Sequence, residues 1–395
     1  MAATLREATA CLAIGSVAYS YAGFPLLLLL LAAIHQTLSD VRYLWRKTDR
    51  RLAEAQELPQ IDVLISAFNE QECIARRIDN LLHVDYPSDR LRVLVGSDGS
   101  TDATGEILRS CSDARIRAYV HAINRGKASV LNDLVEQSSA PVLVFSDANT
   151  FFDRQALRHL VRHFQDPRVG AVVGELRLHS RGGDNQDGLY WRVEQVLKAL
   201  EARIGALLGA NGAIYAIRRE LWQPLRTDTI CDDFCAGMNI AAAGRAVVYD
   251  PEAWAEEESP PDIDDEYRRR VRIGIGNFQA LFRHPEYFTR TGPAAAFAYF
   301  SHKVLRWLGP HLLLIGLVAS LLSAIDSVAW RVWSMLQLLA YGFAAAAYLW
   351  GRAGRPLHPW AKIPAFLFAL NLAFLVASVR YLRGNYSGSW WRTQR

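Results

Sequence analysis

Two oxygen-bearing side chains, Asp147 and Asn149, stand one residue apart directly after the apolar run 142–145. A short apolar run of this kind is typical of a buried parallel strand, and open α/β sheets bind ligands outside the carboxyl ends of their strands. Oxygen ligands at such a position can share a hard divalent cation, which can neutralise a diphosphate. The alternative is a capped turn without a ligand, because Asp and Asn also suit turns and helix caps.

Polar side chains also follow three other strand-like runs. Asn69 and Glu70 close the first run, Asp98 closes the second, and Lys127 follows the third after a glycine. A lysine at a helix N-terminus can bind a phosphate. A carboxylate such as Asp98 can accept a hydrogen bond from a base or a ribose. Polar residues at four successive strand ends predict a crevice for a nucleotide diphosphate. The sequence has neither the glycine spacing of a phosphate loop nor that of a dinucleotide-binding turn.

Two adjacent acids, Asp232 and Asp233, open a later apolar segment. One interpretation is a helix whose N-terminus is stabilised by negative charge. The other is a general base, because a hydroxyl that attacks an electrophilic carbon must lose its proton to a group within hydrogen-bond reach. We favour the general base because the acids follow a predicted nucleotide crevice.

The remaining charged and sulfur-bearing residues exclude other classes of site. The net charge is only +4, and no basic patch is interleaved with aromatic residues, so nucleic acid is not an expected partner. Three arginines, Arg269, Arg270 and Arg272, are either phosphate ligands or interfacial side chains that extend into water. The five cysteines fit no zinc spacing and are expected to be thiols in a reducing compartment.

The elements that must position these side chains alternate in type from residue 61 onward. Strand-like runs cover 61–68, 91–98, 116–123, 141–148, 171–178, 212–219 and 245–250, and helix-like runs lie between them, including 186–207 and 234–244. Such alternation predicts βαβ units, and therefore an α/β fold with a mostly parallel sheet flanked by helices.

Apolar residues are concentrated at the two ends of the chain. Hydrophobic residues make up 51% of the 395 residues, while charged residues still reach 21%, as expected of a soluble domain with attached membrane segments. The candidate spans are 11–34, 304–324, 332–350 and 361–382, and residues 277–303 mix aromatic and basic side chains as interfacial helices do.

Charge around the spans predicts a topology. Basic residues follow the first span, so the N-terminus is expected outside and the next domain in the cytoplasm. The basic loop 351–362 is also expected in the cytoplasm. Counting all four spans then puts the Arg-rich tail outside, so either one span is interfacial or the tail breaks the rule. We predict three regions: 1–58, a transmembrane helix and linker; 59–276, a cytoplasmic domain; and 277–395, interfacial helices and about three transmembrane helices.

The motifs, taken in order, resemble those of the membrane-bound, inverting family-2 glycosyltransferases with a GT-A fold. This group includes cellulose, chitin, hyaluronan and poly-N-acetylglucosamine synthases. The resemblance runs from about residue 61 to residue 280, and it rests on SAFNE, SDGSTD, NRGKA, SDANT, GANGAIYAIRR and CDDF.

The resemblance implies a role for each motif residue. It places Asn69, Glu70 and Asp98 in a nucleoside pocket and makes Lys127 a contact to the nucleotide. Asp147 corresponds to the first acid of the D-x-D metal motif, which holds Mg²⁺ or Mn²⁺. Asp233 takes the place of the general base in the T-E-D motif, with Asp232 as its acidic neighbour.

Two departures from the family pattern bear on function. Asn149 replaces the second acid of D-x-D and removes a charge, so Asn149→Asp is expected to keep or improve activity. The Q-x-x-R-W motif of processive synthases would fall on 269–273, where only Arg272 matches and Ile273 replaces the tryptophan. We therefore expect the addition of one sugar or a few, unless Trp191 or Trp254 supplies the missing platform.

The resemblance thus implies an inverting glycosyltransferase in the bacterial inner membrane, active in polysaccharide or glycan synthesis. Its donor would be a nucleotide-diphosphate sugar, with UDP expected, and its acceptor a saccharide or a lipid-linked saccharide. Membrane lipids, and export or polysaccharide-assembly proteins, are the other expected partners. The alternatives are a processive synthase coupled to export, and a catalytically inactive membrane scaffold of the same fold.

Overall fold

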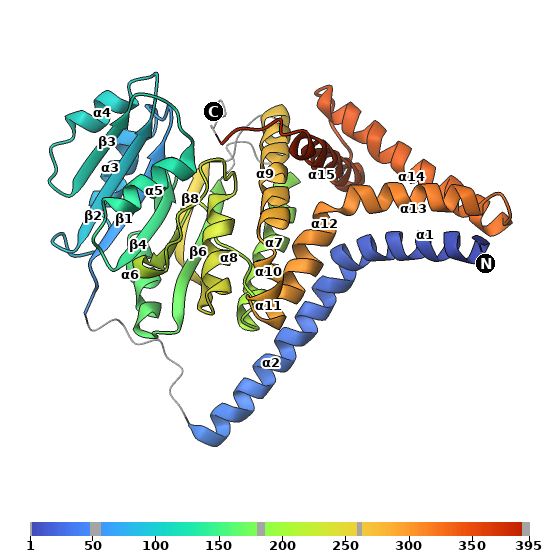
Figure 1. Ribbon diagram of the computed structural model, residues 1–395, viewed down its shortest axis with the longest axis horizontal. Helices are drawn as coiled ribbons and strands as arrows, with labels where there is room; N and C mark the ends of the chain where they lie inside the picture. The colour runs from blue at the N-terminus through green and yellow to red at the C-terminus, as the bar shows by residue number, and fades with distance from the viewer. Residues whose placement is uncertain (1, 48–56, 180–185, 259–262, 389–395) are drawn as a thin grey trace.

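The computed structural model describes residues 2–47, 57–179, 186–258 and 263–388, and in these ranges eight strands form one mixed sheet (Figure 1). The spatial order of the strands is β3-β2-β1-β4-β7-β6-β8-β5. Their bounds are β1 (Ile61–Ala67), β2 (Leu91–Asp98), β3 (Ile116–His121), β4 (Val142–Asp147), β5 (Phe151–Phe152), β6 (Val169–His179), β7 (Tyr215–Arg218) and β8 (Ala246–Glu258).

The first half of the sheet is parallel, as predicted. β1 lies between β2 and β4, and β3 extends the same parallel set. β7 then runs antiparallel between β4 and β6, while β8 is parallel to β6 and antiparallel to β5. The α/β fold with a mostly parallel sheet and flanking helices is confirmed, with β7 and the short β5 as the antiparallel exceptions.

Helices cover both faces of the sheet. The helices of the first half are α3 (Ile74–Leu82), α4 (Thr104–Ser110), α5 (Lys127–Glu136) and α6 (Ala156–Val161). All seven residues of β1 are buried, which explains why the run is apolar at nearly every position rather than alternating. The register pairs Ser66 with Asp147 and Ala67 with Ser97, so β1, β2 and β4 end at the same edge.

β8 is much longer than the predicted strand 245–250. It contains a bulge, because Gly174 of β6 pairs with Asp250 whereas the next residue, Glu175, pairs with Trp254. A side chain at position 174 would collide with the backbone oxygen of Ala253, so the glycine permits the bulge. Beyond the bulge, β8 continues to Glu258 and brings three consecutive glutamates beside the end of β6.

Four helices connect the sheet to the apolar part of the chain. They are α7 (Gln186–Arg203), α8 (Asp232–Ala242), α9 (Ile263–Arg283) and α10 (Glu286–Thr289). One apolar core joins α8 and α9 to later helices and to the N-terminal helix, through buried residues such as Met238, Phe278, Phe374 and Phe24.

The N-terminal apolar segment is longer than predicted and is bent. It comprises α1 (Ala2–Ala18), a π-helical turn η1 (Tyr19–Gly23) and α2 (Phe24–Arg46), so the predicted span 11–34 straddles the turn. α1 lies beside α13 (Figure 1), where a side chain at Gly316 would come within 2.8 Å of Ile14. Residues 48–56 of the predicted linker, including Arg50 and Arg51, lie outside the described residues.

The C-terminal apolar segment contains α11 (Pro293–Ala298), the π-helical η4 (Tyr299–Val304), α12 (Leu305–Trp307), α13 (Gly309–Ser323), α14 (Val328–Arg352) and α15 (Pro359–Leu382). Within the described ranges, three helical segments are long and apolar enough to cross a membrane: α1 to α2, α14 and α15. The segment from α11 to α12 meets α13 at a bend of 65°. If this bent pair forms one span, it is a fourth candidate. The predicted span 304–324 therefore contains a sharp bend.

A cluster of buried charges joins α7 to the start of the bent pair. The carboxylate of Glu194 accepts hydrogen bonds from Arg306 Nη1 at 2.5 Å and from Lys303 Nζ at 3.2 Å. Glu201 lies 2.6 Å from Nδ1 of His302, and both of these side chains are almost completely buried. We call Glu194, Glu201, His302, Lys303 and Arg306 the interface cluster.

Candidate active site

Asp98, the last residue of β2, fixes the loop that precedes α5. Its two carboxylate oxygens accept hydrogen bonds from the backbone N–H groups of Arg125 and Gly126, each at 2.8 Å. Gly126 has a φ of 91°, which favours glycine, and it is followed at once by Lys127, the first residue of α5. The buried carboxylate of Asp98 therefore helps to place Lys127 at the edge of the sheet.

Asn69 and Glu70 tie the end of β1 to the loop after β2. Asn69 adopts a left-handed conformation, with a φ of 55°, and its side-chain oxygen accepts from Thr101 N at 2.8 Å. The backbone N–H of Glu70 donates to Thr104 Oγ1 at 2.8 Å. The structure thus brings the predicted nucleoside-pocket residues Asn69, Glu70 and Asp98 to adjacent strand ends, as the strand pattern predicts.

Lys127 meets two acids from different elements. Its Nζ donates to Asp147 Oδ1 of β4 at 2.7 Å and lies 3.3 Å from Asp232 Oδ2 at the start of α8. Burial opposes the charge of Lys127, but Asp147, Asp232 and Asp233 outweigh burial and raise its pKa. We call Lys127, Asp147 and Asp232 the acid–lysine cluster.

The two acids of α8 lie in different surroundings. Asp232 is buried, and burial is the main cause that raises its pKa to about 6, with Lys127 opposing the shift. Asp233 is partly exposed, and its Oδ1 accepts from the backbone N–H of Phe234 at 2.8 Å. Both acids act electrostatically on Lys127, so the structure brings the predicted base and its neighbour to the strand ends.

Glycines bring the loop 209–212 against this cluster. A side chain at Gly237 of α8 would come within 2.7 Å of the backbone of Gly209 and Ala210, so the loop rests directly on the helix. A Cβ at Gly212 would lie 3.0 Å from Asp147 Oδ2 and 3.3 Å from Lys127 Nζ. Sequence reasoning assigned Gly212 no role, although it belongs to the motif GANG, whose glycines signal a close backbone approach.

Asn149 and Asp147 carry the oxygen atoms that were predicted to hold a metal ion. Their oxygens stand one residue apart beside the strand end, and carboxylate and amide oxygens suit hard divalent cations. In the part of the chain that the structure describes, no group of three or more His, Cys, Asp or Glu side chains is arranged to hold a metal. The oxygen atoms of Asp147 and Asn149 fit a hard cation by their chemistry, and its remaining ligands would come from a bound diphosphate and water. The amide nitrogen of Asn149 donates to Glu257 Oε1 at 2.7 Å, a partner that sequence reasoning missed.

α9, which carries the three arginines, contacts the start of α8, where Cys231 Sγ donates to the carbonyl oxygen of Ile273 at 3.6 Å. The guanidinium of Arg270 stacks over Phe366 of α15 at 4.6 Å. Nε of Arg272 is buried and has no hydrogen-bond partner in the described ranges, and the neighbouring Ile273 is 39% exposed. Trp254 is covered by the guanidinium of Arg177 at 4.2 Å, and the side chain of Trp191 lies outside the described residues.

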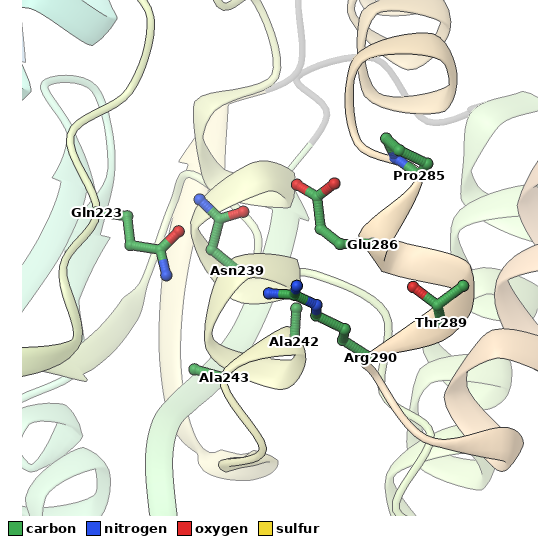
Figure 2. Close-up of a pocket in the computed structure, with 8 residues that line it drawn as sticks. All are labelled: Gln223, Asn239, Ala242, Ala243, Pro285, Glu286, Thr289 and Arg290. Carbon is green, nitrogen blue, oxygen red and sulfur yellow. The ribbon is translucent and has the colours of Figure 1, made fainter.

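A separate cavity lies at the opposite end of α8. Figure 2 shows this pocket of about 440 Å³, lined by polar side chains that include Gln223, Asn239, Glu286 and Arg290. Its lining includes none of the predicted site residues.

Comparisons with known proteins identify relatives of the sheet domain. Residues 62–238 match the family model described as glycosyl transferase family 2. The poly-beta-1,6-N-acetyl-D-glucosamine synthase of Staphylococcus epidermidis is 26% identical over 239 residues, which cover 58% of each chain. The synthase of the same name from Staphylococcus aureus strain COL is 27% identical over 256 residues, 62% of this chain and 60% of that protein. The chain thus spans about six tenths of the length of the curated relatives it matches.

The fold is also found in a solved structure. The mannosyltransferase PcManGT from Pyrobaculum calidifontis, in complex with GDP-Man and Mn²⁺, superposes with a TM-score of 0.67 and 24% sequence identity. The superposition covers 95% of this chain and 99% of that protein, so the two share a fold that includes the apolar helices.

Proposed function

We propose, because residues 62–238 match the family model of glycosyl transferase family 2, that the protein is an inverting enzyme that transfers a sugar from a nucleotide-diphosphate sugar. The expected nucleotide is UDP, and the acceptor is a hydroxyl of a saccharide or of a lipid-linked saccharide. The observation that carries the proposal is the meeting of Lys127, Asp147 and Asp232 at the strand ends, with Asp233 next to them on α8.

The donor half of the site is built from the strand ends. Asn69, Glu70 and Asp98 bind the nucleoside side of the donor, and Lys127 at the N-terminus of α5 contacts its phosphates. Asp147 and Asn149 would hold Mg²⁺ or Mn²⁺, which when bound would neutralise the leaving diphosphate. The complex of PcManGT with Mn²⁺ supports a divalent cation in a protein of this fold.

Asp233 is the proposed general base. It is partly exposed, unlike the buried Asp232, and can reach an acceptor hydroxyl to take its proton as the hydroxyl attacks the anomeric carbon. Asp232 keeps Lys127 in place beside Asp147. Arg269, Arg270 and Arg272 remain candidates for contacts to an acceptor near the membrane surface.

We propose that the protein lies in the bacterial inner membrane with its catalytic domain in the cytoplasm, and helix pairing supports which segments cross together. Arg6 of α1 pairs with Asp326 after α13, so the N-terminus and the turn between α13 and α14 lie on the same side. In Figure 1, α1, α13 and α14 extend together away from the sheet. We assign these helices, with the start of α2, to the membrane crossings, within the regions 1–58, 59–276 and 277–395.

α15 instead lies along the catalytic domain. A side chain at Gly274 of α9 would come within 2.7 Å of Ala377, and Phe282 of α9 stacks on Tyr381. The chain after α15 returns to α9, where Arg283 donates to the hydroxyl of Tyr386 at 2.9 Å. Although α15 is apolar enough to cross a membrane, we place it at the interface because it pairs along its length with the charged α9. The basic loop before α15 and the tail after it are then both cytoplasmic, as the charge rule requires.

A donor panel tests the proposed activity. The detergent-purified protein is incubated with UDP-sugars and GDP-sugars, including UDP-N-acetylglucosamine and GDP-mannose, because the relatives are named for these two sugars. We expect one donor to release its nucleoside diphosphate, with dependence on Mg²⁺ or Mn²⁺. Release from no donor, with and without added oligosaccharide or lipid acceptors, would favour the inactive scaffold.

The size of the product separates single addition from processive synthesis. Because Ile273 lacks the flat face of a tryptophan, we expect one sugar or a few to be added to each acceptor. Long chains formed while most acceptors remain unextended would instead favour a processive synthase, as the names of the staphylococcal relatives suggest.

A further inference from the structure

Asn149, which replaces the second acid of D-x-D in SDANT, has a hydrogen-bond partner elsewhere in the sheet. Asn149 is only 8% exposed, and its Nδ2 donates to Oε1 of Glu257 at 2.7 Å. Glu257 lies near the end of β8, opposite Leu178 of β6, and is 108 residues away in sequence. The bulge at Gly174 sets this register, so the carboxylate reaches Asn149 because β8 continues past its bulge.

The chemistry of a carboxylate fixes which end of the amide faces it. An ionised carboxylate can only accept hydrogen bonds, whereas an asparagine side chain carries a donor NH₂ at one end and an acceptor oxygen at the other. The NH₂ of Asn149 must therefore face Glu257, and the amide oxygen points to the other side of the side chain. In the described ranges, the side-chain oxygen of Asn149 accepts no hydrogen bond.

We propose that Glu257 is a positioning residue for the divalent cation site. It holds the amide of Asn149 so that the oxygen is left for the cation beside Asp147. It also places one negative charge a single hydrogen bond away, where it replaces the charge of the absent second acid. This inference rests on the proposed function, since it needs a cation at Asp147 and Asn149.

The same contact reverses an expectation drawn from the sequence. The D-x-D pattern favours Asn149→Asp as a neutral or beneficial change. With Glu257 at hydrogen-bond distance, that change would set two carboxylates against each other in a site that is mostly buried, and like charges this close cannot both ionise without cost. An acid at position 149 is expected to be tolerated only when position 257 carries an amide, as in Asn149→Asp combined with Glu257→Gln.

The test is a double-mutant cycle with two readouts that do not require turnover. The proteins are the wild type, Glu257→Gln, Asn149→Asp and the double variant, with Glu256→Gln as the control for removing a neighbouring acid from β8. Binding of Mn²⁺ is measured by electron paramagnetic resonance in the presence of UDP or GDP, and thermal stability is measured without metal.

We expect Glu257→Gln to weaken Mn²⁺ binding at least tenfold, the effect typical of partners that orient a metal ligand. A glutamine can pair with either end of the Asn149 amide. The substitution therefore removes both the fixed orientation of that amide and the negative charge at position 257. The double variant should recover to within about threefold of the wild type, because it restores a carboxylate–amide pair. Without metal, Asn149→Asp should lower the melting temperature, and adding Glu257→Gln should restore it.

Three outcomes overturn the inference, and they are distinguishable. If the wild type binds no Mn²⁺ with either nucleotide, the cation of the proposed function is wrong and Glu257 has no ion to serve. If the wild type binds Mn²⁺ and Glu257→Gln binds equally well, only the role of Glu257 is wrong. If Glu256→Gln weakens binding as much as Glu257→Gln, the effect is the general charge of β8 rather than the contact to Asn149.

Discussion

Lys127 dominates the electrostatics of the site at the scale of single residues. Its ammonium balances part of the charge of Asp147 and Asp232, which it contacts from two different elements, and Asp233 adds a third carboxylate nearby. Taken by themselves, these four groups carry a net negative charge, with one ammonium against three carboxylates. That charge favours a divalent cation and would repel a donor diphosphate that arrived without one.

Replacing Asp233 by asparagine should separate catalysis from donor binding. Asp233→Asn keeps the shape of the side chain but removes its basicity, so sugar transfer should fall by about two to four orders of magnitude. Binding of the nucleoside diphosphate should persist, because the donor contacts come from the strand ends. Single-turnover rates and calorimetric titration with the diphosphate measure the two effects separately.

Asp232→Asn is the matched comparison, because it removes the neighbouring carboxylate. Asp232 contacts Lys127, so this change should weaken donor binding. A purified Asp233→Asn protein that turns over at the wild-type rate would show that another group removes the proton.

The sequence predicted which residues gather at the strand ends but not how they pair. Lys127, Asp147 and Asp232 each stand next to a recognisable strand or helix boundary, and parallel strands bring such boundaries to one edge. The contact between Asn149 and Glu257 could not be predicted, because it depends on the register beyond the bulge in β8. A proline and four glutamates in β8 hide the strand from any search for apolar alternation.

At the scale of elements, long buried strands were predictable and short or reversed ones were not. β1, β2 and β4 are apolar runs that match the predicted positions. β7 has only four residues, too few for a pattern to reveal its direction, which is set by its neighbours β4 and β6. The π-helical turns η1 and η4 give no signal in the apolar pattern, because one additional residue per turn keeps the segment helical.

The interface cluster should make stability depend on pH through Glu194. Burial disfavours its charged form, but Lys303, His302 and Arg306 outweigh burial and lower the pKa of Glu194 well below its ordinary value. The ordinary pKa is about 4.3, so the stabilisation is complete above about pH 4.3 and is lost as the pH falls below it toward the folded pKa.

Glu194→Gln tests this prediction. The change leaves buried cations without a charged partner and should lower the free energy of unfolding at pH 7 by up to about 3–5 kcal/mol. It should also flatten the loss of stability below about pH 4.3. Thermal unfolding in detergent across this range is the measurement, and Glu136→Gln, at an exposed position of α5, is the control. Equal pH dependence in both variants would contradict the role of the cluster.

At the scale of the whole molecule, the proposed topology predicts which positions are reached from outside the cell. Cysteines are introduced singly into a Cys11→Ala background and labelled in intact cells with a membrane-impermeant maleimide. Thr4→Cys and Ile325→Cys should react, because both positions are exposed and Arg6 and Asp326 place them on one side. Lys47→Cys and Arg355→Cys should react only after lysis.

Different failures of this pattern have different meanings. Labelling of Lys47→Cys in intact cells would put the catalytic domain outside. Labelling of Arg355→Cys there, with none at Ile325→Cys, would show that α15 crosses the membrane and that the bent pair does not.

The pairing of α1 with α13 also sets an order of events during synthesis. α1 leaves the ribosome before α13, which follows roughly 300 residues later; at typical elongation rates this interval is on the order of 15–60 s. During that interval the sheet domain can fold while it is tethered to a membrane helix that still lacks its neighbour. The close packing at Gly316 is therefore a late, long-range step, and substitutions there should reduce the yield of assembled protein more than they disturb the folded catalytic domain.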